Sequence, residues 1–133
     1  MKLTTKSEYS ILSLIYIARS QNKNFIKIDD ICSYYKIPKK YLEQLLIILK
    51  QNRYIKAKRG VGGGYRLNKI PQEISIAEIV RLMDGALAPT ESVSTYFYST
   101  TPLSKEEKVL KIFKKIRDFI ADTLENSTLK DLL

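Results

Sequence analysis

The sequence contains no histidine and a single cysteine, Cys32. An intramolecular disulfide needs two cysteines, and the usual nitrogen and sulfur ligands of zinc or of an iron–sulfur cluster are nearly absent. Any metal would have to bind through oxygen ligands. The same absences argue against an enzyme, because the chain offers no histidine base and no cysteine–base pair.

Long apolar runs are also missing. No stretch approaches the length of a membrane span, and the first ten residues, MKLTTKSEYS, lack the apolar core of a secretory signal. We therefore expect a cytoplasmic protein. The 133 residues, 44% of them hydrophobic, predict one globular domain that buries a core without disulfides.

Acidic residues are scarce in one quarter of the chain. Between Lys36 and Lys69 there are ten lysines and arginines but only one acid, Glu43, so this segment carries the whole net charge of +9. The remaining 13 basic and 13 acidic residues cancel. A solvated basic face is one explanation, but general lysine usage would not exclude acids from a single segment. The pattern therefore favours a segment that binds a polyanion.

Apolar residues at helical spacing predict five helices: residues 5–20, about 28–35, a Pro38-started helix to about 51, about 76–84 ended by Gly85, and 104–125. Three Ser/Thr-x-x-Glu motifs, beginning at Thr5, Ser75 and Ser104, predict capping boxes. In the third helix the inward stripe is Leu42, Leu45, Leu46 and Leu49. In the first helix it is Leu12, Ile15, Tyr16 and Ala18, widened by Tyr9, Ile11, Leu14 and Ile17. Asn52 is expected to end the third helix in the left-handed conformation.

The stretch KRGVGGGYRL, residues 58–67, holds four of the five glycines. A phosphate-binding loop or a dinucleotide fingerprint requires a helix after its glycines, whereas Tyr65-Arg66-Leu67 alternates like a strand. Residues 54–58 alternate in the same way, so the stretch predicts a β-hairpin with a glycine tip rather than a linker. Phe25-Ile26 is a further short extended piece. Arg59 and Arg66 beside the tip indicate a nucleic-acid backbone or a narrow minor groove as the partner.

The order of three helices followed by a basic hairpin is that of a winged helix-turn-helix. The chain resembles the Rrf2 family of bacterial regulators, which includes the IscR, NsrR and CymR types. The resemblance rests on 41–45 (YLEQL), 58–60 (KRG), 62–67 (GGGYRL), 76–80 (IAEIV) and 84–85 (DG), and it covers nearly everything except residues 87–103. The expected fold is mainly α with a small β-hairpin wing and a long C-terminal dimerisation helix.

This resemblance implies a homodimeric regulator, in character a repressor, that binds double-stranded DNA at a palindromic operator. It places Arg59 in a minor groove and the third helix on base edges, where Glu43 and Gln44 suit cytosine and adenine unless they are simply surface residues. The DNA-binding set is Lys39, Lys40, Glu43, Gln44, Lys50, Lys58, Arg59, Gly62, Gly63, Gly64 and Tyr65. Its lysines are expected to contact phosphates.

The C-terminal helix has an apolar stripe longer than a small core covers, which predicts a homodimer. Its members are Val109, Ile112, Phe113, Ile116, Ile120 and Leu124. We accordingly expect a DNA-binding part over residues 1–85, a variable loop over 86–103, and a dimerisation helix with its tail over 104–133. The aromatic cluster of the loop, Tyr96-Phe97-Tyr98, either lines an effector pocket or packs on the dimer helices, and we favour packing.

Relatives that bind an iron–sulfur cluster do so through three loop cysteines, and the loop of this chain has none. We therefore expect no cluster, no other cofactor and no metal site, as in the CymR type, which responds through a partner such as cysteine synthase. Glu8, near the position of an extra cluster ligand in some relatives, is then a capping-box carboxylate. Cys32 is expected to be an inert core thiol rather than a redox sensor. The alternative function is a protein-interaction module with weak or lost DNA binding.

Overall fold

The computed structural model describes residues 1–20 and 24–133, so the polar turn predicted at 21–24 lies largely outside the described residues. The helices are α1 (Thr5–Arg19), α2 (Ile28–Tyr35), α3 (Lys39–Gln51), α4 (Ile76–Asp84) and α5 (Glu107–Glu125), and the strands are β1 (Ile55–Lys58) and β2 (Gly64–Leu67). Short 3-10 turns occupy Pro71–Glu73, Glu91–Val93, Pro102–Lys105 and Leu129–Leu132. The predicted five helices and hairpin are confirmed.

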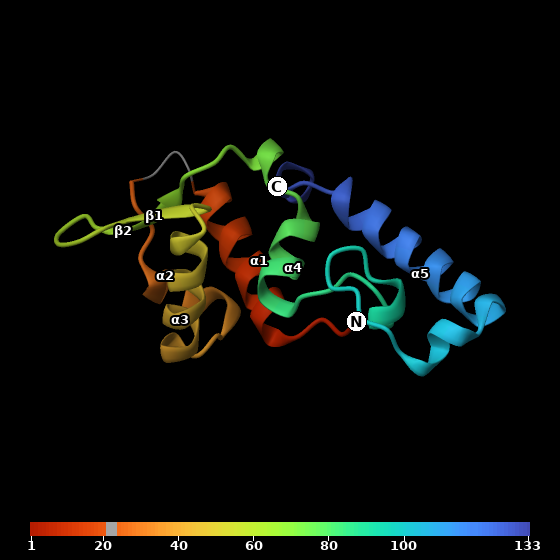
Figure 1. The fold of residues 1–133 in the computed structure, drawn as a ribbon. Helices are drawn as coiled ribbons and strands as arrows, with labels where there is room; N and C mark the ends of the chain where they lie inside the picture. The colour runs from red at the N-terminus through yellow and green to blue at the C-terminus, as the bar shows by residue number, and fades with distance from the viewer. Residues whose placement is uncertain (21–23) are drawn as a thin grey trace.

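The elements are arranged in three parts along the molecule (Figure 1). The hairpin projects from one end, beside α2 and α3; α1 and α4 pack together in the middle; and α5 runs along the other end. No helix in the described ranges is long and apolar enough to cross a bilayer. The hairpin and α5 therefore lie at opposite ends of a common helical core.

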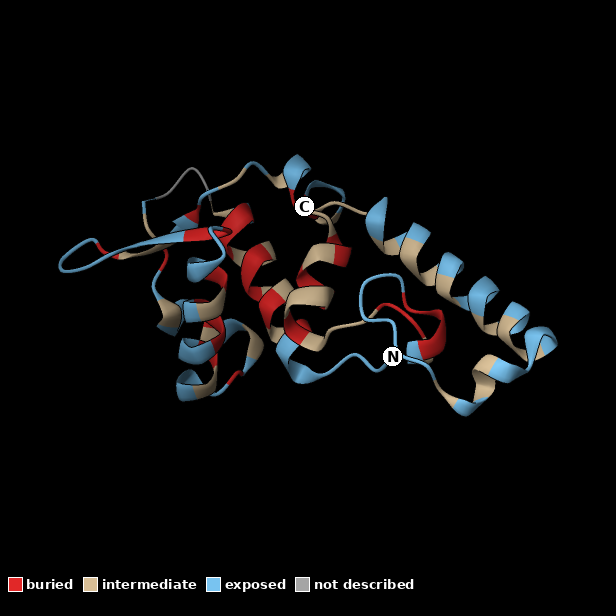
Figure 2. Ribbon diagram, viewed as in Figure 1, coloured by how far each residue is buried: buried red, intermediate tan, exposed pale blue. Residues whose placement is uncertain are grey.

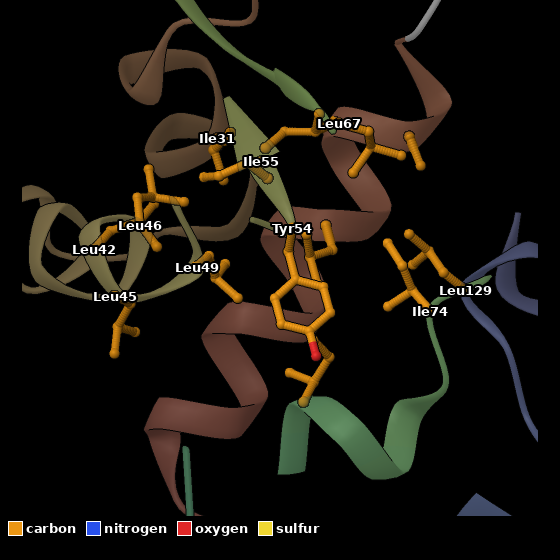
Figure 3. Packing of buried hydrophobic residues seen from close by; sticks show 14 of the residues in the cluster. Ile31, Leu42, Leu45, Leu46, Leu49, Tyr54, Ile55, Leu67, Ile74 and Leu129 are labelled. Carbon is orange, nitrogen blue, oxygen red and sulfur yellow. The ribbon is translucent and has the colours of Figure 1, made fainter. Parts of the chain in front are cut away.

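The core is built on the inward stripe of α3. Leu42, Leu45, Leu46 and Leu49 are all fully buried, as predicted, and they pack with Ile31, Tyr54, Ile55, Leu67, Ile74 and Leu129 (Figure 3). Leu129 comes from the C-terminal tail, and its N–H donates to the carbonyl of Ile74 over 2.8 Å. The tail is therefore held in the same core as α3 and the hairpin.

The prediction for α1 was right for only part of the buried face: Leu14, Ile17 and Ala18 were in the predicted stripe, and the serines were not. The buried residues are Ser7, Ser10, Ser13, Leu14, Ile17 and Ala18, whereas Leu12, Ile15 and Tyr16 are only half-buried. Small side chains let α4 pack closely against α1, and the Ser13 hydroxyl is satisfied by donating to the carbonyl of Tyr9 over 2.7 Å. Apolar residues alone therefore identify the buried face incompletely, because half of the buried positions are serines.

Only one of the three predicted capping boxes forms. At α4 the Ser75 hydroxyl accepts from the N–H of Glu78 and the Glu78 carboxylate accepts from the N–H of Ser75. At α1 the N-cap is Thr4 instead of Thr5, so Glu8 is an exposed residue and not a capping-box carboxylate. At α5 the hydroxyl of Ser104 caps the preceding 3-10 turn, and the helix begins only at Glu107.

The end of α3 also differs from the prediction. Asn52 keeps a right-handed backbone, with φ of −94°, and Arg53 instead takes the left-handed conformation with φ of 64°. The Asn52 side chain caps the helix by donating to the carbonyl of Ile48 over 2.8 Å. The chain thereby turns directly from α3 into β1.

Candidate nucleic-acid interface

The outer face of α3 presents polar and cationic side chains to solvent. Lys40, Glu43, Gln44 and Lys50 are exposed, together with Ile47, whose side chain was not among the predicted site residues. An exposed isoleucine between cationic positions suits apolar contact with a thymine methyl group. Helical periodicity predicted Ile47 on this outer face, but it gave no signal that the residue is a contact, so Ile47 was left out of the predicted site.

Lys39 is already paired within the chain. Its ammonium lies 3.0 Å from the carboxylate of Asp29 in α2, and both side chains are at least half exposed. The hydrogen bond and the charge of Asp29 raise the pKa of Lys39. Because this ion pair is exposed, it is weak, and a phosphate group can displace the carboxylate.

The hairpin is antiparallel, with Lys56 opposite Arg66, Ala57 opposite Tyr65 and Lys58 opposite Gly64. The residues between the strands form its tip, at which Arg59 and Val61 are exposed. Gly60 and Gly62 take left-handed φ values of 88° and 75°. Apart from the adjoining residues, no atom of the described chain lies within 4 Å of where their Cβ atoms would be, so the backbone at the tip is open to an outside partner.

Gly63 and Gly64 allow other parts of the chain's own backbone to approach closely. A Cβ on Gly63 would lie 2.3 Å from the carbonyl oxygen of Lys58, and one on Gly64 would lie 2.4 Å from that of Ile26. Ile26 approaches closely because it forms two 2.7 Å hydrogen bonds with Tyr65, as a one-residue third strand. The extended piece predicted at Phe25-Ile26 is thus confirmed, and the glycines explain how it fits.

A groove of about 380 Å³ separates α3 from the hairpin. Its lining comprises Leu46, Ile47, Lys50, Ala57, Lys58, Arg59, Gly64 and Tyr65. The structure therefore brings five of the predicted site residues around this groove: Lys50, Lys58, Arg59, Gly64 and Tyr65. Lys39, Lys40, Glu43 and Gln44 lie nearer the start of α3 and are not part of this lining.

The base of the hairpin is tied to α4. The hydroxyl of Tyr54 donates to the Glu78 carboxylate over 3.1 Å. Burial, followed by the charge of Glu78 and this hydrogen bond, raises the pKa of Tyr54 to about 12. The ammonium of Lys69 lies 4.4 Å from the centre of the Tyr54 ring. These contacts fix the position of the hairpin relative to the helical core.

Cys32 is half-buried rather than fully buried as predicted. Burial raises the pKa of the Cys32 thiol, and the nearby carboxylate of Asp29 raises it further. A raised pKa disfavours the thiolate, which is the reactive form. The low reactivity of this thiol stays a prediction, and its position is not that of a core residue.

The loop between α4 and α5 is packed at one part and exposed at another. Leu87, Ala88, Ser92, Val93 and Ser94 are buried, whereas the side chains of Tyr96, Phe97 and Tyr98 are exposed (Figure 2). The Arg117 guanidinium of α5 donates to the carbonyl of Val93 over 2.9 Å, and Arg81 of α4 lies 4.9 Å from the ring centre of Tyr96. The aromatic cluster therefore contacts α4 of its own chain through Tyr96 but leaves much of its surface exposed.

The predicted dimerisation stripe is divided between two faces of α5. Ile120 and Leu124 pack against the cluster of Ile76, Ala77, Val80 and Leu87. Ile112 and Ile116 are exposed on the other side, and so is Phe119, which the prediction omitted. Figure 2 shows no fully buried residue along this helix. The exposed α5 face is therefore Ile112, Ile116 and Phe119, spaced at i, i+4 and i+7.

Comparison with known proteins agrees with this architecture. Residues 3–133 match the family model Rrf2, described as an iron-dependent transcriptional regulator. The chain is 28% identical to the HTH-type transcriptional regulator CymR of Bacillus subtilis over 132 residues, which cover 99% of this chain and 89% of that protein.

Solved structures show the same likeness. A structure of CymR, the global cysteine regulator of B. subtilis, superposes with a TM-score of 0.80 at 27% identity and covers 99% of this chain and 95% of its own. The oxidized form of Staphylococcus aureus CymR has a TM-score of 0.75 at 32% identity, with the same coverages. IscR of T. potens shares the fold, with a TM-score of 0.77 at 23% identity. The match covers 99% of this chain and 85% of that one. The chain belongs to the Rrf2 family of winged-helix, DNA-binding transcriptional regulators.

Proposed function

We propose that the protein is a homodimeric, sequence-specific regulator that binds a palindromic operator, acts there as a repressor, and uses no iron–sulfur cluster. The observation that carries the proposal is the groove between α3 and the hairpin, which Lys50, Lys58 and Arg59 border. This groove lies in the segment that has ten basic residues and only one acidic residue. This charge distribution fits the phosphate backbone of a duplex.

In this proposal α3 lies in the major groove and the hairpin tip reaches the adjacent minor groove. Glu43 and Gln44 are exposed on the outer face of α3, where they meet base edges, with Glu43 accepting from a cytosine amino group. Lys39, Lys40, Lys50 and Lys58 bind phosphates. The open backbone at Gly60 and Gly62 lets the tip approach closely while Arg59 enters the minor groove.

The exposed α5 face supports the dimer. Ile112 and Phe119 are 60% and 73% exposed, on a helix at the opposite end of the molecule from the hairpin. Two copies that join through this face bury the stripe against itself and leave both hairpins free. A two-fold symmetric protein then matches a palindromic operator with half-sites about one helical turn apart.

The dependence of duplex binding on salt distinguishes this function from the alternative, a protein-interaction module. We expect the logarithm of the affinity to fall linearly with the logarithm of salt concentration, with a slope of about −0.9 for each phosphate contact. Duplexes selected from a random pool and a scrambled duplex, titrated by fluorescence anisotropy at several salt concentrations, provide the measurement. If no duplex binds in a salt-sensitive way, the proposed function is refuted and the alternative remains.

The residues present do not fit an iron–sulfur cluster, although the family description names iron. Such clusters are held by several thiolates, whereas this chain has one cysteine, on α2, and none in the loop over residues 86–103. Within the described ranges, no three carboxylate or cysteine side chains are grouped so as to hold a metal. We expect protein purified without oxygen to be colourless; a visible charge-transfer band with stoichiometric iron would contradict the proposal.

A further inference from the structure

A small hollow lies where α4, the loop that precedes α5, and α5 itself meet. Its volume is about 20 Å³, and it is lined by Arg81, Leu87, Ser94, Thr95, Tyr96, Phe97, Arg117 and Ala121. We call it the arginine pocket, because one arginine from each helix lines it. A volume of about 20 Å³ holds a group the size of one water molecule, so a larger ligand must extend out of the pocket. The arginine pocket shares no residue with the groove between α3 and the hairpin.

Arg81 has more hydrogen-bond donors than partners. Its side chain is only 23% exposed, and its Nη2 pairs with the carboxylate of Glu125 in α5. One face of its guanidinium lies against the ring of Tyr96. A guanidinium carries five N–H donors, and no other acceptor among the described residues bonds to this one. The remaining donors of Arg81 therefore require an acceptor from outside the chain.

Arg117 and the loop are fixed in place beside Arg81. The Nη1 of Arg117 donates to the carbonyl of Val93 over 2.9 Å, and its Nε and Nη2 both donate to the carboxylate of Asp118. Within the loop, the N–H of Phe97 donates to the hydroxyl of Ser94 over 3.0 Å. The pocket is therefore formed before a ligand arrives, which lowers the entropy cost of binding.

The two ion pairs leave the inside of the pocket positive. The carboxylate side chains of Glu125 and Asp118 are 41% and 61% exposed, so water screens much of their charge. Arg81 and Arg117 are each only 23% exposed, so their charges are screened less. The pocket accordingly favours an anionic group.

Two aromatic side chains beside the arginines indicate what the rest of the ligand is. Tyr96 and Phe97 both line the pocket, although they are 72% and 48% exposed. A water molecule would satisfy a donor of Arg81, but it would leave this apolar surface uncovered. A ligand with an anionic head and a flat apolar body satisfies both features, because its body packs on the two rings.

We propose that the arginine pocket binds a small organic carboxylate with an aromatic or similarly flat apolar body. A planar carboxylate matches a guanidinium in shape and in charge. Arg81 binds the carboxylate, Arg117 adds positive charge, and Tyr96 and Phe97 cover the body. Because the arginine pocket is separate from the groove beside α3, this binding requires no duplex and does not depend on the function proposed above.

Binding of para-fluorobenzoate, followed by fluorine NMR without DNA, tests this inference. The resonance of the ligand should shift and broaden as protein is added. The neutral amide para-fluorobenzamide has nearly the same shape, and it should bind about 10-fold more weakly or less, because it lacks the charge that strengthens hydrogen bonds to arginine. Equal binding of the two compounds, or no binding of either, would refute the proposed site.

Two substitutions locate the binding at the arginine pocket. Arg81→Lys retains the charge and its attraction to Glu125 but loses the planar fork, so it should weaken para-fluorobenzoate binding by about 10-fold. Phe97→Ser should also weaken binding, since it removes a ring that covers the ligand. Both variants should fold, which thermal melting verifies; should Arg81→Lys melt much lower, Phe97→Ser decides, because Phe97 is half exposed.

Tyr98→Ser is the matched control. Tyr98 is the next residue along the loop and is 63% exposed, but it does not line the arginine pocket. We expect this variant to bind para-fluorobenzoate as the unchanged protein does. If Tyr98→Ser weakens binding as much as Phe97→Ser, or if a folded Arg81→Lys variant binds as well as the unchanged protein, the ligand lies elsewhere and the inference is wrong. Salt-sensitive duplex binding without carboxylate binding would refute this inference alone and leave the proposed function intact.

Discussion

Replacing Arg59 with alanine should lower operator affinity by about 10- to 100-fold, which corresponds to about 1–3 kcal/mol for a lost groove contact. Arg59 is exposed at the hairpin tip and forms no ion pair among the described residues. Its guanidinium is therefore free to enter a narrow minor groove, whose negative potential attracts arginine. The measurement is anisotropy titration with the selected duplex.

Arg59→Lys is the matched control because it retains the charge. We expect its salt slope to equal that of the unchanged protein, while its preference for a narrow, A·T-rich minor groove declines. The melting temperature of both variants should stay within a degree or two of the original, since an exposed side chain without partners adds little stability. A large drop in melting temperature for Arg59→Ala would show that the residue is structural.

The sequence predicts α3 and the hairpin well because local rules determine them. The leucines of α3 follow the helical period, and every one of them is buried. The hairpin follows from alternation on both sides of a glycine turn, and its register agrees. Three cations of the basic segment, Lys50, Lys58 and Arg59, then meet at the groove between these two elements.

Long-range contacts explain what the sequence does not predict. The need for Gly64 arises from Ile26, almost forty residues earlier, whose backbone would clash with a side chain there. The cap of α1 is shifted from Thr5 to Thr4, whose hydroxyl and N–H both donate to the carboxylate of Asp84 at the end of α4. Burial raises the pKa of Asp84, but these hydrogen bonds lower it by more. The pKa of Asp84 is therefore below its usual value. No local pattern contains this information.

The faces of α5 illustrate the same limit. Helical periodicity shows which residues share a side, but it does not show which side meets the rest of the chain. Ile120 was predicted to face a partner, yet it packs on the cluster formed by α4 and Leu87. Phe119, one position earlier, is exposed. Only the placement of α5 against α4 distinguishes these neighbouring residues, and the exposed α5 face is therefore a structural finding.

The double variant Ile112→Glu/Phe119→Glu should convert the proposed dimer into folded monomers. Burying two carboxylates against their symmetry mates leaves unpaired charges in an apolar contact, which is strongly unfavourable. Both side chains are exposed in the single chain, so its own core should remain intact. Analytical ultracentrifugation should give twice the chain mass of 15.4 kDa for the unchanged protein and the single-chain mass for the variant. Lys114→Gln, which alters charge on another part of α5, should remain dimeric.

The loss of the dimer should affect DNA binding more than any single contact. When one subunit binds its half-site, the second half-site is bound at a high effective concentration, which typically increases affinity by about 10²- to 10⁴-fold. The monomeric variant should lose this factor on a duplex with two half-sites, while its affinity for a single half-site should equal that of the unchanged protein. This equality is the critical result, because it separates lost dimerisation from a damaged hairpin or α3. A variant that remains dimeric, or an unchanged protein that is already monomeric at micromolar concentration, would show that the exposed α5 face has another partner.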